Sequence, residues 1–184
     1  MWSSRDVALA IILGVLAFVY SVSTIQITFL ITGIPGIGYL FTIGIVIIFG
    51  VSFLIFKGRR WRFFLLTIIY QFLLSFILVN IGPFQVLRAV PMLTWTFFQD
   101  LFFNSIYQYF LENNKLKLFS ILQGLGGLLG DTFFRVLLYP ILMPPEYISV
   151  YLNTTVLMLP VILLSGIFGG YIAFNIYSRI KNIK

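Results

Sequence analysis

The chain contains no cysteine and no histidine, and only five of its 184 residues are acidic. Without cysteine it has no disulfide, no thiol nucleophile and no cysteine metal site. Without histidine it also lacks the commonest general base and the commonest metal ligand. These absences leave little material for a catalytic or metal centre. They favour a protein that is not an enzyme and that uses no cofactor.

Charge is also scarce. Charged residues make up 9% of the chain, hydrophobic residues make up 60%, and the mean hydropathy is +1.06. A soluble domain carries about 25% charged residues, so we expect a multi-pass protein of the cell (plasma) membrane, embedded in lipid. Residues 1–184 are predicted to form a single transmembrane domain. The formal charge of +7 does not indicate a nucleic-acid partner, because the basic residues flank apolar runs, as in membrane-protein loops.

Six segments approach the length of roughly 20 apolar residues that a bilayer-spanning helix needs. The sequence therefore predicts an all-α integral membrane protein with six transmembrane helices. The predicted spans are about 7–28, 37–56, 61–80, 88–111, 116–140 and 151–177.

Basic residues gather on one side of this topology. Cytoplasmic loops are enriched in lysine and arginine, and an even number of spans places both ends of a chain on the same side. We therefore expect both termini to be cytoplasmic. The residues concerned are Arg5, Lys57, Arg59, Arg60, Arg62, Lys115, Lys117, Arg179, Lys181 and Lys184.

All seven prolines fall in the opposite, outer half of the predicted topology. Most lie in or beside loops near 29–36, 81–87 and 141–150, whereas Pro91 and Pro160 lie in the outer thirds of spans four and six. Proline ends or kinks a helix. Irregular backbone at membrane depth is tolerated where it is buried in protein or lines a cavity. The prolines therefore either simply end helices or shape a pocket that opens outward.

Four charged residues interrupt long apolar stretches: Arg88, Asp100, Asp131 and Arg135. A charge at the bilayer centre costs about 3 kcal/mol on insertion scales, so such residues are functional candidates. Counting from the predicted span ends, we expect Asp100, Asp131 and Arg135 to converge in the middle and outer bilayer. Arg88 lies closer to the outer interface, where its side chain can reach water.

The charged residues belong to two helical stripes. Thr96, Asp100 and Asn104 recur every four residues in span four, which keeps them within a sector of about 80°. Asp131 and Arg135 are neighbours on one face of span five, and Gln123, Gly127 and Tyr139 continue that face. The predicted substrate-binding residues are Asp100, Asp131, Arg135, Trp95, Thr96, Asn104, Tyr139 and Arg88.

Two interpretations of these charges stay open. They form internal ion pairs that fix the register of the helices, since buried ions usually pair. Alternatively, some of them face a wet cavity and hold a small polar ligand. Polar side chains at similar depths, such as Gln71 and Gln99, favour the second interpretation, because ligand pockets commonly combine aromatic walls with a few polar groups.

Small residues at helical spacing indicate close helix contacts. In span five Gly126 and Gly130 are four residues apart, and in span six Gly166 and Gly170 are. These pairs favour packing within one bundle. Span one carries a similar stripe of Ala10, Gly14 and Ala17, which is available to a partner protein.

Three features resemble the substrate-binding S-components of energy-coupling factor (ECF) transporters. They are the small-residue first helix from Arg5 to Ala17, Gly36-Ile-Gly38 at the start of span two, and Phe168-Gly-Gly-Tyr171 before a basic tail. The resemblance implies a six-helix subunit that captures a vitamin-like micronutrient from outside. It also implies a transmembrane T-component and two ATPase subunits as partners, with Ala10, Gly14 and Ala17 docking on the T-component. The chain itself has no phosphate-binding P-loop.

Other functions remain possible on the sequence alone. The chain is alternatively a non-catalytic accessory subunit of a larger membrane complex, in which the charges are structural. It is alternatively a stand-alone proton-linked transporter. Gly130-Asp131 also resembles the GxGD motif of intramembrane aspartyl proteases, but Leu128 replaces the first glycine of that motif.

Overall fold

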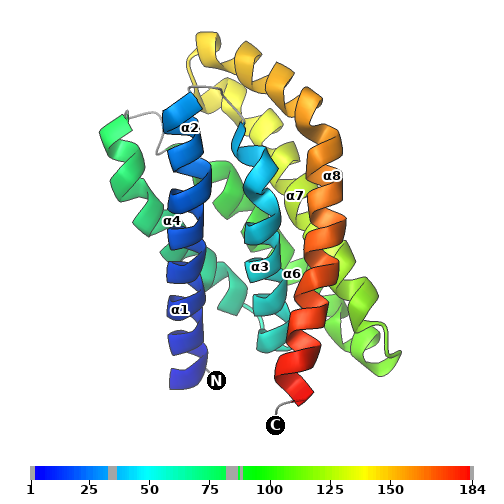
Figure 1. Ribbon diagram of the computed structural model, residues 1–184. Coiled ribbons are helices and arrows are strands. Elements are labelled where there is room, and N and C mark those ends of the chain that lie inside the picture. The colour runs from blue at the N-terminus through cyan, green and yellow to red at the C-terminus, as the bar shows by residue number, and fades with distance from the viewer. Residues whose placement is uncertain (1–2, 33–36, 82–86, 88, 183–184) are drawn as a thin grey trace.

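The computed structural model describes residues 3–32, 37–81, 87 and 89–182. All regular structure within these ranges is helical, and the helices join into six rods packed side by side (Figure 1). The first rod comprises α1 (Ser4–Tyr20), the π-helical η1 (Ser21–Gln26) and α2 (Ile27–Thr32). The 3-10 helix η2 (Ile37–Phe41) leads into α3 (Thr42–Phe56). The remaining rods are α4 (Arg62–Ile81), α6 (Ala89–Glu112), α7 (Leu116–Leu142) and α8 (Pro145–Asn182).

The predicted all-α fold is confirmed, and the six rods coincide with the six predicted spans. Four helical stretches are long and apolar enough to cross a membrane, which indicates a multi-pass membrane protein. They are Ser4–Thr24, Gly38–Phe56, Leu116–Leu142 and Tyr151–Lys181. Among the residues whose side chains the structure describes, α4 contributes the apolar stretch Arg62–Ile77, and α6 carries buried polar residues in its middle.

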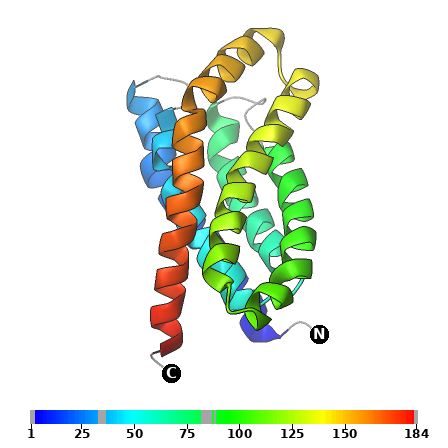
Figure 2. The ribbon, with the colours of Figure 1, turned by 90° about the vertical axis from the view of Figure 1, so that its right-hand side faces the viewer.

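The helix α3 lies at the centre of the bundle, in contact with α1, α4, α7 and α8. The helix α1 begins, and α8 ends, at the same end of the molecule (Figure 1). At the other end, the first turns of α8 slant across the bundle before the helix runs down beside α7 (Figures 1 and 2). Pro160 lies inside α8, where it removes a backbone hydrogen bond and favours a bend.

Glycines bring α7 and α8 into backbone contact. A Cβ atom added at Gly124 would lie 2.5 Å from the Gly166 carbonyl oxygen, and one at Gly170 would overlap the Ser120 carbonyl oxygen. The Ser120 hydroxyl also donates a 2.7 Å hydrogen bond to the Gly170 carbonyl oxygen. The prediction that the span-six glycines pack within the bundle is therefore confirmed.

The small-residue stripe of α1 also faces the interior. Ala10 and Ala17 are fully buried, and a Cβ atom added at Gly14 would lie 3.0 Å from the Leu66 carbonyl oxygen of α4. The expectation that this stripe docks on a partner protein is therefore wrong, because its residues are buried inside the bundle. The small side chains instead let α1 approach α4 closely. The exposed side of α1 instead carries large aliphatic side chains such as Ile12.

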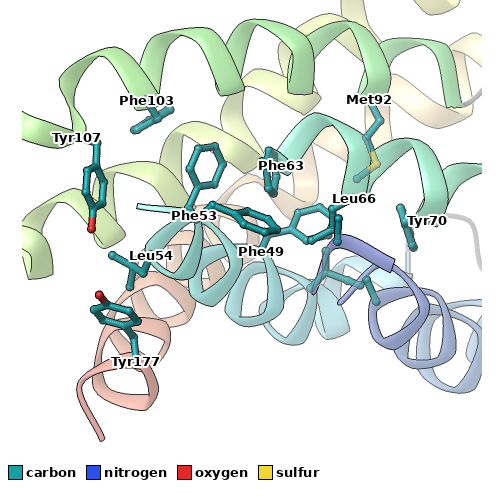
Figure 3. Close-up of a cluster of buried hydrophobic side chains, with 14 of the residues drawn as sticks. Phe49, Phe53, Leu54, Phe63, Leu66, Tyr70, Met92, Phe103, Tyr107 and Tyr177 are labelled. Carbon is teal, nitrogen blue, oxygen red and sulfur yellow. The ribbon is translucent and has the colours of Figure 1, made fainter. Parts of the chain in front are cut away.

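An aromatic core fills the space between α3, α4 and α6 (Figure 3). The Phe63 ring meets Phe49 edge-on at 5.1 Å and Phe53 at 4.2 Å between ring centroids. The cluster extends from Tyr107 at one end to Tyr70 at the other (Figure 3). Such rings bury large apolar areas and fix the rods against one another.

Ion pairs tie the end of the bundle where α1 begins. The buried Asp6 carboxylate accepts hydrogen bonds from Arg59 at 3.1 Å and from Arg62 at 3.2 Å. Ser3 caps α1 by accepting a hydrogen bond from the Asp6 N–H group. These contacts connect the first turn of α1 to the loop between α3 and α4.

Candidate functional site

A cavity of about 110 Å³ lies between α3, α4, α6 and α7. Apolar side chains, among them Phe49, Met92 and Leu128, form much of its wall. Phe49 and Met92 also belong to the aromatic core, so the cavity continues the core rather than lying apart from it. Polar groups reach it chiefly from α6 and α7.

The charged part of the cavity wall is an ion pair on α7. Arg135 Nε lies 2.8 Å from Asp131 Oδ2, one helical turn away, and the two side chains are 22% and 18% exposed. The Arg135 Nε–H group is not directed along this line, so the contact is an ion pair without a hydrogen bond. The predicted pairing of Asp131 with Arg135 is confirmed.

Four polar atoms of the cavity-lining residues are buried without a hydrogen-bond partner in the part of the chain that the structure describes. They are Trp95 Nε1, Gln123 Oε1, Asp131 Oδ1 and Arg135 Nε, the last of which contacts Asp131 in the ion pair. Gln123 is only 1% exposed. Leaving a buried polar group unpartnered costs about 1–3 kcal/mol, and the large majority of buried side-chain polar atoms in proteins have a partner. The cavity therefore combines an apolar wall with unused hydrogen-bonding capacity.

Two glycines of α7 let α6 side chains come close. The Trp95 indole lies where a Cβ atom of Gly130 would be, and Gln99 Nε2 lies 2.8 Å from the Cβ position of Gly127. Gln99 also donates a 3.3 Å hydrogen bond to the Gln123 carbonyl oxygen. A side chain at either glycine would displace a polar residue of the cavity wall.

Tyrosines pack beside the Arg135 end of the cavity. Tyr139 is 2% exposed, and its hydroxyl lies 3.5 Å from Arg135 Nη1. Its ring meets Tyr151 of α8 at 4.5 Å between centroids. The Tyr151 hydroxyl shares a 2.6 Å hydrogen bond with the hydroxyl of Tyr39 in η2. These rings join η2, α7 and α8 at the end of the bundle that the first turns of α8 cross.

Asp100 lies elsewhere, and the expectation that it converges with Asp131 and Arg135 is wrong. It is fully buried, and it accepts hydrogen bonds from the backbone N–H groups of Trp61 (2.7 Å) and Phe64 (2.8 Å). These groups belong to the start of α4, where helical N–H groups have no partner in their own helix. Asp100 thus serves as an N-terminal cap supplied by a different helix.

The same cap accounts for Asn104. Its side-chain amide donates a 2.6 Å hydrogen bond to Asp100 Oδ1, which places it away from the cavity wall. Trp61 has a φ of 72°, which is unusual for a bulky residue, and its hydrogen bond to Asp100 holds that conformation. The depth argument was wrong because α4 begins beside the middle of α6 rather than level with its end.

The remaining predicted substrate-binding residues differ in where they lie relative to the cavity. Trp95 and Thr96 line the cavity, although the Thr96 hydroxyl already donates to the Leu93 carbonyl oxygen at 3.1 Å. Tyr139 lies beside Arg135 but not on the cavity wall. Arg88 lies outside the described residues.

Gln99 and Gln123 both line the cavity. Both were recognised in the sequence as polar side chains of spans four and five, but neither is among the predicted substrate-binding residues. Gln123 shares the stripe of Asp131, and Gln99 follows Trp95 by one turn, so helical spacing was the available signal. That signal points equally to Asp100, and spacing alone does not show which neighbouring helix a side chain faces.

Comparison of the chain with protein-family models, with curated proteins and with solved structures finds no match. Within the described ranges, no three acidic side chains come close enough together to hold a metal ion. A functional interpretation therefore rests on the cavity and on the sequence pattern.

Proposed function

We propose that this protein captures a small polar solute inside the membrane, as the substrate-binding subunit of an ECF-type ATP-driven importer. The observation that carries the proposal is the cavity, because the residues that line its largely apolar wall include the Asp131–Arg135 pair and hold buried polar atoms without partners. A wall that is mostly apolar with a few convergent polar groups is typical of ligand sites. The sequence features that resemble the S-components, from the small-residue first helix to Phe168-Gly-Gly-Tyr171, support the same function.

A purely structural ion pair explains this arrangement less well. Buried pairs stabilise a fold when further hydrogen bonds satisfy their remaining atoms. The Asp100 cap meets that condition, with three donors on its carboxylate. Asp131 differs, because its Oδ1 atom has no partner among the described residues. One aspartate therefore serves the fold, and the other is left with capacity for a ligand.

The size of the cavity limits what it holds in this conformation. An engineered cavity of about 150 Å³ accommodates benzene, and this cavity measures about 110 Å³. A slim solute fits directly, whereas a vitamin with fused rings would have to displace side chains such as Met92 or Leu128. In the proposed cycle, a T-component and two ATPase subunits supply the energy for release. Their docking surface lies outside the buried stripe of α1.

We further propose that all six rods span the membrane with both termini cytoplasmic. Because the chain contains no cysteine, a single introduced cysteine reports only its own location. We expect Pro145→Cys to react with an impermeant maleimide on intact cells, and Lys181→Cys to react only after permeabilisation; both positions are exposed. Ala173→Cys, at a fully buried site, is the unlabelled control. Labelling of Lys181→Cys on intact cells would contradict this orientation.

The main alternative is a non-catalytic accessory subunit, and the structural role of Asp100 favours it in part. Native mass spectrometry of the gently solubilised protein separates the two functions. We expect a bound small molecule in the wild type that is absent from the Asp131→Asn variant but retained by an exposed control, Gln108→Leu. Stoichiometric protein partners without any small molecule would contradict substrate capture and support the accessory role.

A further inference from the structure

The two ends of the cavity differ in chemistry. Eight residues of α7 separate Gln123 from Asp131, which is about 12 Å along the helix axis. The Trp95 indole contacts Gly130, so its Nε1 atom belongs to the Asp131 end. Gln123 Oε1 lies 3.5 Å from the Cβ position of Gly50 in α3, at the other end. The unpartnered atoms therefore form two separate poles.

The wall between these poles is mostly apolar. Leu128 of α7 and Val46 and Phe49 of α3 line it, and the Gln99 amide that lies beside Gly127 already donates its hydrogen bond to the Gln123 carbonyl oxygen. A cavity of about 110 Å³ stretched over about 12 Å is narrow. It suits an extended molecule better than a round one.

Charge balance excludes a strongly charged occupant. Among the described residues that line the cavity, Asp131 and Arg135 carry the charge, and they neutralise one another at 2.8 Å. An ion with net charge would enter this low-dielectric space without a counter-charge, which costs several kcal/mol. A neutral ligand needs no counter-charge, and the lining residues hold unpartnered atoms of both kinds for it: Trp95 Nε1–H can donate, whereas Asp131 Oδ1 and Gln123 Oε1 can accept.

We infer that the ligand is a slim, linear, net-neutral molecule with a hydrogen-bonding group at each end and an apolar middle. One end carries an N–H or O–H donor and an acceptor, for Asp131 and Trp95. The other end carries a donor for Gln123. A primary amide at each end of a short alkyl chain has this chemistry. This inference rests on the proposed capture function and narrows its substrate class.

Linear diamides test the inference on the purified full-length protein in nanodiscs. Binding of succinamide, glutaramide and adipamide is measured by saturation-transfer NMR and compared with hexanamide, which has one polar end. Glutarate and 1,5-diaminopentane are the charged probes of similar length. We expect one of the diamides to bind at least ten-fold tighter than hexanamide, and the charged probes to bind more weakly than that diamide.

The Gln123→Leu variant tests whether Gln123 binds the second end of the ligand. It should remove the preference for the diamide over hexanamide while leaving hexanamide binding within two-fold, because only the distant contact is lost. Gln108→Leu, the same exchange at an exposed site, should change neither.

Three outcomes would overturn the inference. A charged probe that binds best would overturn the neutral class and leave substrate capture standing. Equal binding of diamide and hexanamide, or a Gln123→Leu variant with an unchanged preference, would overturn recognition at two ends. A cavity that takes up water but none of these probes would overturn the ligand class, and the native mass spectrum would then decide separately whether the protein captures any solute.

Discussion

Replacing Asp100 by alanine is expected to lower the unfolding temperature by about 10 °C. The change removes the acceptor for the Trp61 and Phe64 N–H groups and for the Asn104 amide, and all three lose a hydrogen bond of 2.6–2.8 Å. Each buried group left unpartnered costs about 1–3 kcal/mol. A total near 4 kcal/mol corresponds to about 10 °C in a chain of this length, where each kcal/mol shifts the transition by about 2–4 °C. Intrinsic tryptophan fluorescence follows the transition, since the chain has three tryptophans.

The conservative variant provides the matched comparison. Asp100→Asn keeps one carbonyl oxygen for one of the two backbone donors, so its loss should be roughly half as large. Ser105→Ala, on the exposed side of the same helix, should change the transition by less than about 2 °C, in line with surface substitutions. An Asp100→Ala protein that unfolds together with wild type would show that the cap contributes nothing to stability.

Breaking the Asp131–Arg135 pair is expected to destabilise the protein by about 3 kcal/mol, and removing both charges to restore most of that loss. Removing one partner of a buried pair leaves an uncompensated charge, at a cost of about 3–5 kcal/mol. Asp131→Asn should cost more than Arg135→Gln, because arginine stays charged whereas a stranded carboxyl group can take up a proton. The double variant Asp131→Asn/Arg135→Gln contains neither ion. Unfolding in urea or by heat, in the same nanodiscs, gives the comparison.

Ligand binding separates structure from function in this series. The double variant should be nearly as stable as wild type yet fail to retain the native ligand, because both charged groups of the cavity wall are gone. Arg60→Gln, at an exposed position near the end of α3, is the control for loss of an arginine alone. If the double variant is no more stable than either single variant, Asp131 and Arg135 do not stabilise each other as an ion pair. If it binds ligand normally, the cavity is not the site.

The helical framework was predictable because it depends on local sequence. Apolar runs of spanning length, broken by basic turns, place the rods to within a few residues, for example 61–80 against Arg62–Ile81 for α4. The Asp131–Arg135 pair was predictable for the same reason, since residues one turn apart on a helix must be neighbours. Both inferences need only the geometry of a single helix.

The predictions that were wrong depended on how one helix packs against another. Depth along a span did not show that Asp100 faces the start of α4, because the vertical offset between two rods is set by packing and not by either sequence alone. The stripe of Ala10 and Ala17 likewise shows that something approaches α1 closely. Whether that neighbour is α4 or a second protein is decided by the tertiary arrangement.

The Asp100 cap also constrains the order in which the chain can assemble. Synthesis proceeds from the N-terminus, and Asp100 follows its two backbone partners by 39 and 36 residues. The α4 segment is therefore synthesised before its cap has been made, and the N–H groups at its start must meanwhile find another hydrogen-bond acceptor. Only when α6 packs beside α4 does the Asp100 carboxylate take over that role. The fourth rod thus completes the third, and the start of α4 reaches its final environment late in folding.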